Sequence, residues 1–335
     1  MKPKWIGLAL AIATTLTVLV NQRGVGIARD ETVYFSAGDR YADWWVRALT
    51  FRSHASIAQT FGGALGGAGN PEHPPLMKLA SGLAHRWLPG DLTAYRVPSA
   101  ALHGVCAYLI FAFALELWGL AEAVLAALAF ALLPRALFHA GLACFDAPTM
   151  TLWFATIYAY WRCLDGRRWP WQVGVAWGLL LATKHTALLL PFALAAHQAI
   201  LIWRAKRFAH WRIAVAMIVL GPLVLFALWP WLWVAPIAHV RDWLGFHLHH
   251  VHYNFEYLGT NWNAPPFPWH VALVTTLFTV PTATLAACAL GSGVLATRWR
   301  TQPRDARDAR APGWLLLCSA LASIGPFFLG STPIF

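Results

Sequence analysis

The sequence predicts an all-α integral membrane protein that crosses the bilayer about nine times. Of its 335 residues, 59% are hydrophobic and 12% are charged, whereas soluble domains carry about a quarter charged residues. This composition excludes an ordinary cytosolic enzyme and a disordered tail protein. Apolar stretches suited to the ~30 Å hydrocarbon core lie at residues 5–20, 97–118, 121–134, 149–164, 171–183, 185–203, 213–234, 269–295 and 314–329.

The placement of charge predicts which loops face the cytoplasm. Under the positive-inside rule, the N-terminus and alternate loops are cytoplasmic because they hold the basic clusters Lys2/Lys4, Arg162/Arg167/Arg168, Arg204/Lys206/Arg207/Arg212 and Arg298/Arg300/Arg304/Arg307/Arg310. Nine of the fourteen carboxylates fall in the opposite, outer loops: Asp30, Glu31, Asp39, Asp43, Glu72, Asp91, Asp146, Asp242 and Glu256. The net charge of +11 therefore indicates topology and anionic lipid, and no nucleic-acid partner is expected.

We expect a single transmembrane domain, residues 1–335, with three distinctive loops. Residues 21–96 and 235–268 form long outer loops, and residues 296–313 form a basic cytoplasmic linker. The first apolar segment lacks a clean small-x-small cleavage site, so we expect an uncleaved anchor. An apolar stripe in the first loop, with Asp43 and Arg47 spaced at i,i+4 on the other side, predicts an amphipathic helix at the membrane interface. The stripe consists of Tyr41, Trp44, Trp45, Ala48 and Leu49.

The first outer loop begins with a carboxylate pair, Asp30 and Glu31, followed by Tyr34. Like charges beside a membrane are costly unless they are solvated, paired or functional. A catalytic role is one interpretation, and a helix N-cap, with Asp30 or Ser36 as the capping residue, is the other.

A second candidate segment is Glu72-His73-Pro74-Pro75, which precedes Lys78. The two prolines disfavour helix at His73 and predict a rigid turn from which Glu72 and His73 project. The glycine-rich stretch at residues 62–69 lacks the Lys-Ser/Thr of a phosphate-binding loop, so a flexible hinge is the better interpretation.

Cationic and acidic side chains also flank the middle spans. Arg135, His139 and Asp146 are spaced so that one helix would carry all three on a single stripe. Arg135 could equally be a snorkelling interfacial residue, and Asp146 could cap the following helix. Lys184 lies between short apolar segments with no carboxylate nearby in sequence, which marks a functional site or polar cavity. Arg96, just before the second span, could also be a positional anchor.

The late outer loop carries His247, His249, His250 and His252. Imidazoles at this spacing can bind a transition metal, with Glu72 as a further candidate ligand. A polar lining for a phosphate or a sugar is the alternative.

These motifs, in this order, resemble those of the protein O-mannosyltransferase and aminoarabinose-transferase superfamily, the multispanning GT-C glycosyltransferases that use polyprenyl-phosphate sugars. The matching segments are Asp30-Glu31-x-x-Tyr34, Glu72-His73-Pro74-Pro75-Leu76, Arg96-Val97-Pro98-Ser99-Ala100, Pro134-Arg135 to Asp146-Ala147-Pro148 and Ala182-Thr183-Lys184-His185-Thr186. The resemblance implies a GT-C-type transmembrane helix bundle whose long outer first loop carries interfacial amphipathic helices. It also implies an active site on the periplasmic or extracellular side of the inner membrane.

The resemblance implies that Asp30 is the catalytic base, with Glu31 and Asp146 as further acidic catalytic residues. In aminoarabinose-type relatives the turn reads Glu-Lys-Pro-Pro; its Glu and a later His can hold a metal, and its Lys meets the donor phosphate. Because His73 replaces that Lys, we expect Lys78, Arg96 or Lys184 to neutralise the phosphate. The implied donor- and acceptor-binding residues are Tyr34, Glu72, His73, Lys78, Arg96, Arg135, His139 and Lys184.

The implied reaction needs a base for the acceptor hydroxyl and cations for the departing phosphate. Direct displacement with one carboxylate base inverts the anomeric centre. We expect mannosyltransferase-like hexosyl or pentosyl transfer to a hydroxyl or phosphate of a protein, lipid or glycan, with a divalent metal as the one possible cofactor. Relatives continue beyond a segment like residues 331–335, so a C-terminus that is short for the family is expected.

Two rival functions belong to other classes. A transporter or flippase of a lipid-linked substrate predicts internal repeats and ionisable residues at mid-membrane, and the sequence shows neither. A non-catalytic sensor or assembly subunit is favoured only if a shortened chain has lost activity.

Overall fold

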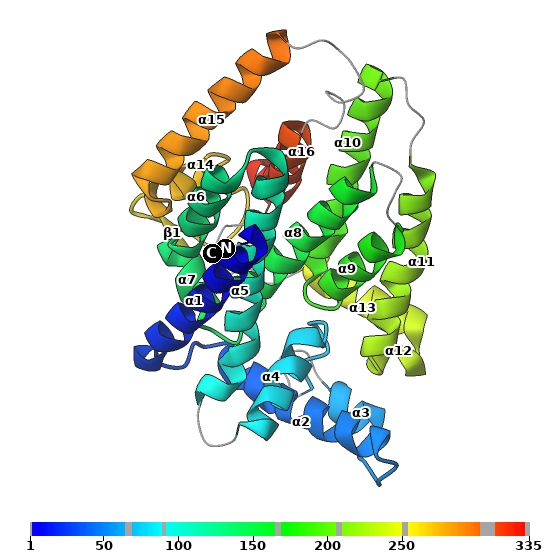
Figure 1. Cartoon of the computed structure of the whole chain (residues 1–335). Helices are drawn as coiled ribbons and strands as arrows, with labels where there is room; N and C mark the ends of the chain where they lie inside the picture. The colour runs from blue at the N-terminus through cyan, green and yellow to red at the C-terminus, as the bar shows by residue number, and fades with distance from the viewer. Residues whose placement is uncertain are drawn as a thin grey trace. The chain divides into compact units, whose positions relative to one another are not determined.

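A computed structural model describes residues 2–63, 69–88, 92–164, 169–205, 210–249, 254–301 and 312–331. Their regular structure is almost entirely helical, and the strands in these ranges form one short antiparallel pair, which confirms the all-α fold class (Figure 1). The chain divides into two compact units. Unit 1 comprises Met1–Cys163, Arg168–Ala187 and Ile213–Leu248; unit 2 comprises Leu164–Arg167, Leu188–Arg212 and His249–Phe335.

Unit 1 carries all the helices that concern the candidate site. They are α1 (Pro3–Asn21), η1 (Gln22–Gly24), α2 (Glu31–Leu49), α3 (Ile57–Phe61), α4 (Leu76–Trp87), α5 (Leu92–Leu117), α6 (Leu120–Ala131), α7 (Pro134–Ala140), α8 (Asp146–Cys163), α9 (Trp171–Leu181), η2 (His185–Leu189, which runs into unit 2), α11 (Trp211–Leu228), α12 (Trp231–Val234) and α13 (Pro236–Leu248).

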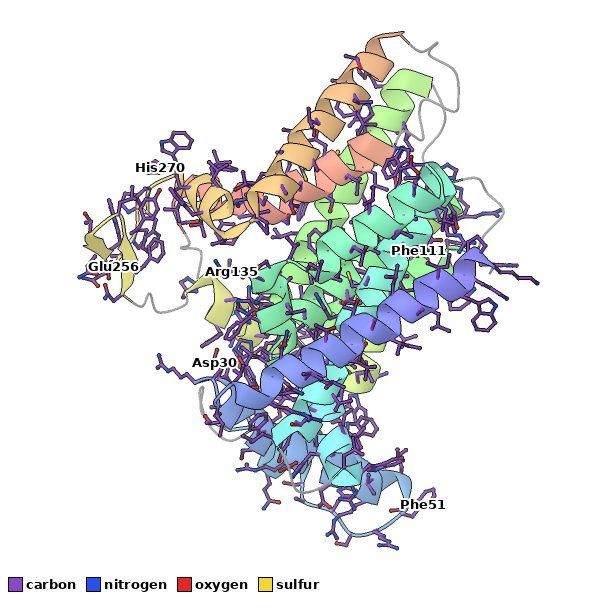
Figure 2. The ribbon with its side chains drawn as sticks, turned by 60° about the vertical axis from the view of Figure 1, so that its left-hand side comes forward. Asp30, Phe51, Phe111, Arg135, Glu256 and His270 are labelled. Carbon is purple, nitrogen blue, oxygen red and sulfur yellow. The ribbon has the colours of Figure 1, made fainter. Side chains whose placement is uncertain are left out.

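Small residues let α1 and α5 approach each other closely. A Cβ atom on Gly7 would meet the ring of Phe111, and one on Gly104 would lie 2.5 Å from the backbone oxygen of Ala11. Phe111, marked in Figure 2, is 1% exposed and belongs to a buried cluster that includes residues of α6. Apolar packing along this contact therefore fixes the helix that precedes the first long loop.

In that loop, α2 and α4 cross at two glycines. A Cβ atom on Gly82 would overlap the carbonyl oxygen of Gly38, and one on Gly38 would lie 2.7 Å from the carbonyl oxygen of Lys78. Only residues without a side chain permit this backbone contact. The crossing holds the start of α2 beside the turn that leads into α4.

Part of the apolar stripe of α2 is covered by protein, whereas Leu49, at its end, is 70% exposed. Tyr41 is 0% and Trp44 5% exposed, and both pack with Phe61 and Trp231 in one buried cluster. An amphipathic pattern identifies an apolar face without identifying what covers it, so the interfacial position of α2 stays a prediction.

Five helices, or unbroken runs of helix, among the described residues are long and apolar enough to span a membrane: Pro3–Gly24, Leu92–Leu117, His185–Trp203, Trp211–Leu228 and Pro312–Leu329. The number rises to seven if each bent pair counts as one span; the pairs are α6 with α7, bent by 65°, and α14 with α15, bent by 116°. Helix α9 is apolar but shorter. The nine predicted stretches all overlap helices, and their number as spans stays a prediction.

Unit 2 contains α10 (Leu190–Ala205), β1 (Phe255–Tyr257), β2 (Thr260–Trp262), α14 (Val271–Thr279), α15 (Thr282–Thr301), α16 (Pro312–Ile324) and η4 (Gly325–Leu329). Helices α10 and α16 pack together. The strands pair Phe255 with Trp262, and the hydroxyl of Tyr257 lies 2.7 Å from Nδ1 of His270.

Candidate active site

Asp30 lies immediately before α2, at the N-cap position, but its side chain makes no capping hydrogen bond. The side chain is exposed, and within the described ranges its carboxylate has no hydrogen-bond or ion-pair partner. Asp30 therefore occupies the N-cap position, as one of the two interpretations predicted, but its side chain does not cap the helix. An exposed, uncommitted carboxylate can accept a proton from a substrate hydroxyl.

Glu31 and Arg96 form a buried ion pair. Glu31 is 0% and Arg96 2% exposed. Nε of Arg96 donates to Oε1 at 2.8 Å, and Nη2 donates to Oε2 at 2.7 Å. Glu31 also accepts from the backbone N–H groups of Ala28 and Ala143, at 2.9 and 2.8 Å. The carboxylate is therefore occupied by partners of its own chain.

Arg96 also fastens the segment between α1 and α2. Its guanidinium donates to the backbone carbonyl oxygens of Val25 at 3.0 Å and Gly26 at 2.7 Å. A bidentate guanidinium-carboxylate pair has a fixed geometry. The adjacent Asp30 is positioned by this support, and neither Glu31 nor Arg96 is presented to a substrate.

Tyr34 lies one helical turn beyond Asp30 and is surrounded by acidic groups. Its ring packs 4.4 Å from that of Phe145 and meets His73 edge-on at 6.0 Å. Burial raises the pKa of Tyr34, and the charges of Asp30, Asp146 and Glu72 raise it further, with Cys144 also contributing. Charges from the start of α2, from Glu72 and from the start of α8 therefore all act on this phenol.

Asp146 begins α8 and has two nitrogen partners, the ammonium of Lys184 and the imidazole of His139. Nζ of Lys184 lies 2.8 Å from Oδ1, and Nδ1 of His139 lies 3.4 Å from Oδ2. Burial alone would raise the pKa of the Asp146 carboxyl, but the hydrogen bonds and charges of His139 and Lys184 outweigh it and hold the pKa below its usual range. Asp146 is thus an ionised group that orients Lys184.

The single helical stripe predicted for Arg135, His139 and Asp146 is not formed. Helix α7 ends at Ala140, and a turn precedes α8. The turn brings His139 back against Asp146 and leaves Arg135 exposed on α7, where Figure 2 shows it at the same edge of the ribbon as Asp30. Spacing alone could not show the break.

The turn at residues 70–75 is held by Lys78, which is 1% exposed. Its Nζ donates to the backbone oxygen of Asn70 at 2.7 Å, to Oδ1 of Asn70 at 2.9 Å and to the backbone oxygen of His73 at 2.8 Å. Burial lowers the pKa of Lys78 to about 7, and the nearby charge of Glu72 opposes that shift. The ammonium group is committed to the turn and does not reach a donor phosphate.

Three imidazoles meet beside this turn. The rings of His185 and His247 stack with centroids 3.6 Å apart, and those of His73 and His247 are 5.5 Å apart. Burial lowers the pKa of His73, and Lys78, His247, His185 and Lys184 lower it further. His73 is therefore neutral at physiological pH. Lys78 and Lys184 are the lysines whose charges act on its imidazole.

The metal hypothesis gains no support from the part of the chain that the structure describes, which holds no group of three His, Cys, Asp or Glu residues suited to a metal ion. It is the backbone oxygen of Glu72, and not its carboxylate, that lies 2.9 Å from Nε2 of His247. His249 is exposed, and His250 and His252 lie outside the described ranges.

Several residues make contacts at the candidate site that the sequence did not predict. Tyr41 donates to the backbone oxygen of Gly69 at 2.5 Å, Asn70 binds both Lys78 and Glu72, and Phe145 packs on Tyr34. His185 stood within a quoted motif, but its contact with His247 joins segments that are distant in sequence. Only Asn70, directly before Pro71, carried a local signal of a turn.

Apolar membrane-length helices and a polar cluster at the helix ends together define a multi-pass membrane protein with the site beside its first loop. The sequence model of the family described as dolichyl-phosphate-mannose-protein mannosyltransferase matches residues 72–233. A solved structure, ArnT from Cupriavidus metallidurans in the apo state, matches with a TM-score of 0.58 and 15% identity over 97% of this chain. No curated protein matches.

The family match over residues 72–233 and the shared fold both support the resemblance to GT-C membrane glycosyltransferases found in the sequence. The chain covers 59% of the length of the ArnT chain.

Proposed function

We propose that the chain transfers a sugar from a polyprenyl-phosphate donor to an acceptor hydroxyl or phosphate, with inversion, at the outer face of the inner membrane. The observation that carries the proposal is the uncommitted carboxylate of Asp30 together with the Asp146-Lys184 pair, because the charges of all three groups act on the same Cys144 thiol. A base and a cation are the two groups that displacement of a lipid phosphate requires. The N-terminus is proposed to be cytoplasmic, from the distribution of basic residues.

In the proposed mechanism, Asp30 takes the proton of the acceptor hydroxyl as its oxygen attacks the anomeric carbon. The bond to the phosphate oxygen breaks, and its electron pair remains on the phosphate. Lys184 supports the leaving phosphate, because an ammonium has three donors and Asp146 accepts from it at 2.8 Å. Arg135, exposed on α7, is a second cation for the phosphate.

The contacts favour different roles for some residues than the resemblance implied. Glu31 and Arg96 support the start of α2, and Lys78 supports the turn at residues 70–75. We assign these three residues to positioning. His73 takes the place where aminoarabinose-type relatives carry Lys, and its neutral imidazole binds the donor as a hydrogen-bonding group. The acceptor in this proposal is a protein, a lipid or a glycan, and the assay below identifies it together with the donor sugar.

The test uses membranes of a deletion strain that contain the protein, incubated with radiolabelled polyprenyl-phosphate sugars. Asp30→Asn is expected to reduce label transfer by about 100-fold or more, the contribution typical of a general base. Asp43→Asn is the matched control, because Asp43 is an exposed carboxylate on the same helix, paired with Arg47 at 2.7 Å. Undiminished transfer by a well-folded Asp30→Asn protein would refute the assignment.

A further inference from the structure

Helix α13 carries two different faces. One face holds His239, Trp243 and His247, each one turn apart. Trp243 is 4% exposed and packs against Trp229 with ring centroids 5.7 Å apart, and His247 reaches the backbone of Glu72. This face is turned to the protein and the candidate site.

The neighbouring face of α13 is apolar and open. It bounds a shallow hollow of about 610 Å³, whose lining residues are Pro236, Ile237, Val240, Arg241, Leu244, Gly245 and Leu248. Ile237 is 86% and Leu248 79% exposed. Exposed apolar surface of this kind, continuous along a helix, marks an interaction surface.

Helix α13 begins shortly after a helix of membrane-spanning length along the chain. Helix α11 has the length and hydropathy of a span, and Ile218 and Leu223 on it are 70% and 55% exposed. Beyond its end, Val234 of α12 is 62% exposed, followed by Ile237 of α13. Apolar side chains that face outward from a span contact lipid, and the short distance along the chain from α11 favours lipid as the cover of the apolar face of α13 as well.

Charge and size also favour lipid over a second copy of the chain. Arg241 is 82% exposed within this surface, where a guanidinium can reach phosphate headgroups while its methylenes remain in the apolar layer. A stripe on a helix of 13 residues is roughly 20 Å long. That length provides much less than the ~800 Å² per partner of a stable protein interface.

We propose that α13 lies in the membrane interface, with its apolar face docked on the hydrocarbon of the bilayer and its His247 face turned to the candidate site. The helix then takes an interfacial role like the one that the sequence predicts for α2. The proposal is independent of the catalytic activity.

The experiment places nitroxide spin labels on the full chain in nanodiscs of phosphatidylethanolamine and phosphatidylglycerol. Ile237→Cys and Leu244→Cys test the apolar face, and Asp242→Cys on the polar side is the matched control. All three are made with Cys288, an exposed native thiol, replaced by Ala. Labels at 237 and 244 are expected to collide mainly with oxygen, which concentrates in hydrocarbon, and the label at 242 mainly with a water-soluble nickel chelate.

Two outcomes overturn the proposal. Nickel access at 237 and 244 equal to that at 242 means that the face meets water. Access to neither reagent means that protein covers it. Val240→Cys and Leu248→Cys replace any variant that fails to elute as a folded protein, so that the face is tested in every case.

Discussion

The buried Glu31-Arg96 pair predicts a loss of stability that distinguishes a structural role of Glu31 from a catalytic role. Four N–H donors converge on the Glu31 carboxylate, two from Arg96 and one each from Ala28 and Ala143, at 2.7–2.9 Å. Glu31→Gln keeps the shape of the side chain. Its NH₂ group, however, replaces an oxygen that accepted hydrogen bonds, so that one donor faces other donors. Removing one partner of a buried pair costs about 3–5 kcal/mol, because the remaining charge is uncompensated.

The assay is unfolding of the purified protein in detergent, followed with and without a second substitution. Glu31→Gln is expected to lower the free energy of unfolding by about 3–5 kcal/mol. Adding Arg96→Met removes the uncompensated guanidinium and is expected to recover part of that loss. Asp43→Asn breaks an exposed pair on the same helix and is expected to cost less than about 1 kcal/mol.

The result that refutes this reasoning is a Glu31→Gln protein that is as stable as the unmodified chain and yet inactive. Glu31 would then act on the substrate, as the family resemblance implied. Equal destabilisation by the single and the double variant would show that Arg96 does not require Glu31.

Three further predictions concern the crossing of α2 and α4, the turn and the phosphate cation. Gly82→Ala would overlap the carbonyl oxygen of Gly38 and is expected to cost about 1–3 kcal/mol in detergent unfolding; Gly24→Ala meets no atom within 4 Å and is its control. Because burial lowers the pKa of Lys78 to about 7, the unfolded chain binds more protons above that pH, so stability rises with pH from about 7 towards 10. Lys78→Met is expected to abolish this rise in a pH series, and an unchanged slope would contradict the assignment. Lys184→Gln is expected to reduce sugar transfer by about 10- to 100-fold, the value of a charged hydrogen bond, while the melting temperature is retained; full activity would exclude Lys184 as the phosphate cation.

Much of the fold could be predicted from the sequence because apolar length and charge asymmetry are local properties. The same holds for Asp30, whose position before a helix follows from its surroundings in the chain. The partner of Arg96 could not be predicted, since its ion pair joins the start of α5 to the start of α2. Nothing in the sequence around either residue identifies the other.

At two further places the observed contacts differ from the expected ones because a sequence pattern does not identify the contacting partner. The stripe of Tyr41 and Trp44 has the same pattern whether protein or lipid covers it, and the structure covers it with protein. Lys78 follows Pro-Pro as a phosphate-binding lysine could, but three carbonyl oxygens of its own turn surround its ammonium group. Chemical type was predictable at these positions, and the identity of the contact was not.

The meeting of His73, His185 and His247 has a consequence for how the protein is made. A membrane protein is inserted from its N-terminus, so Asp30 and the turn carrying His73 enter the membrane environment first. His185 follows, and His247, at the end of α13, arrives last. A partly synthesised chain therefore holds Asp30 without the imidazole cluster, and the candidate site is complete only when the stretch through α13 has been synthesised.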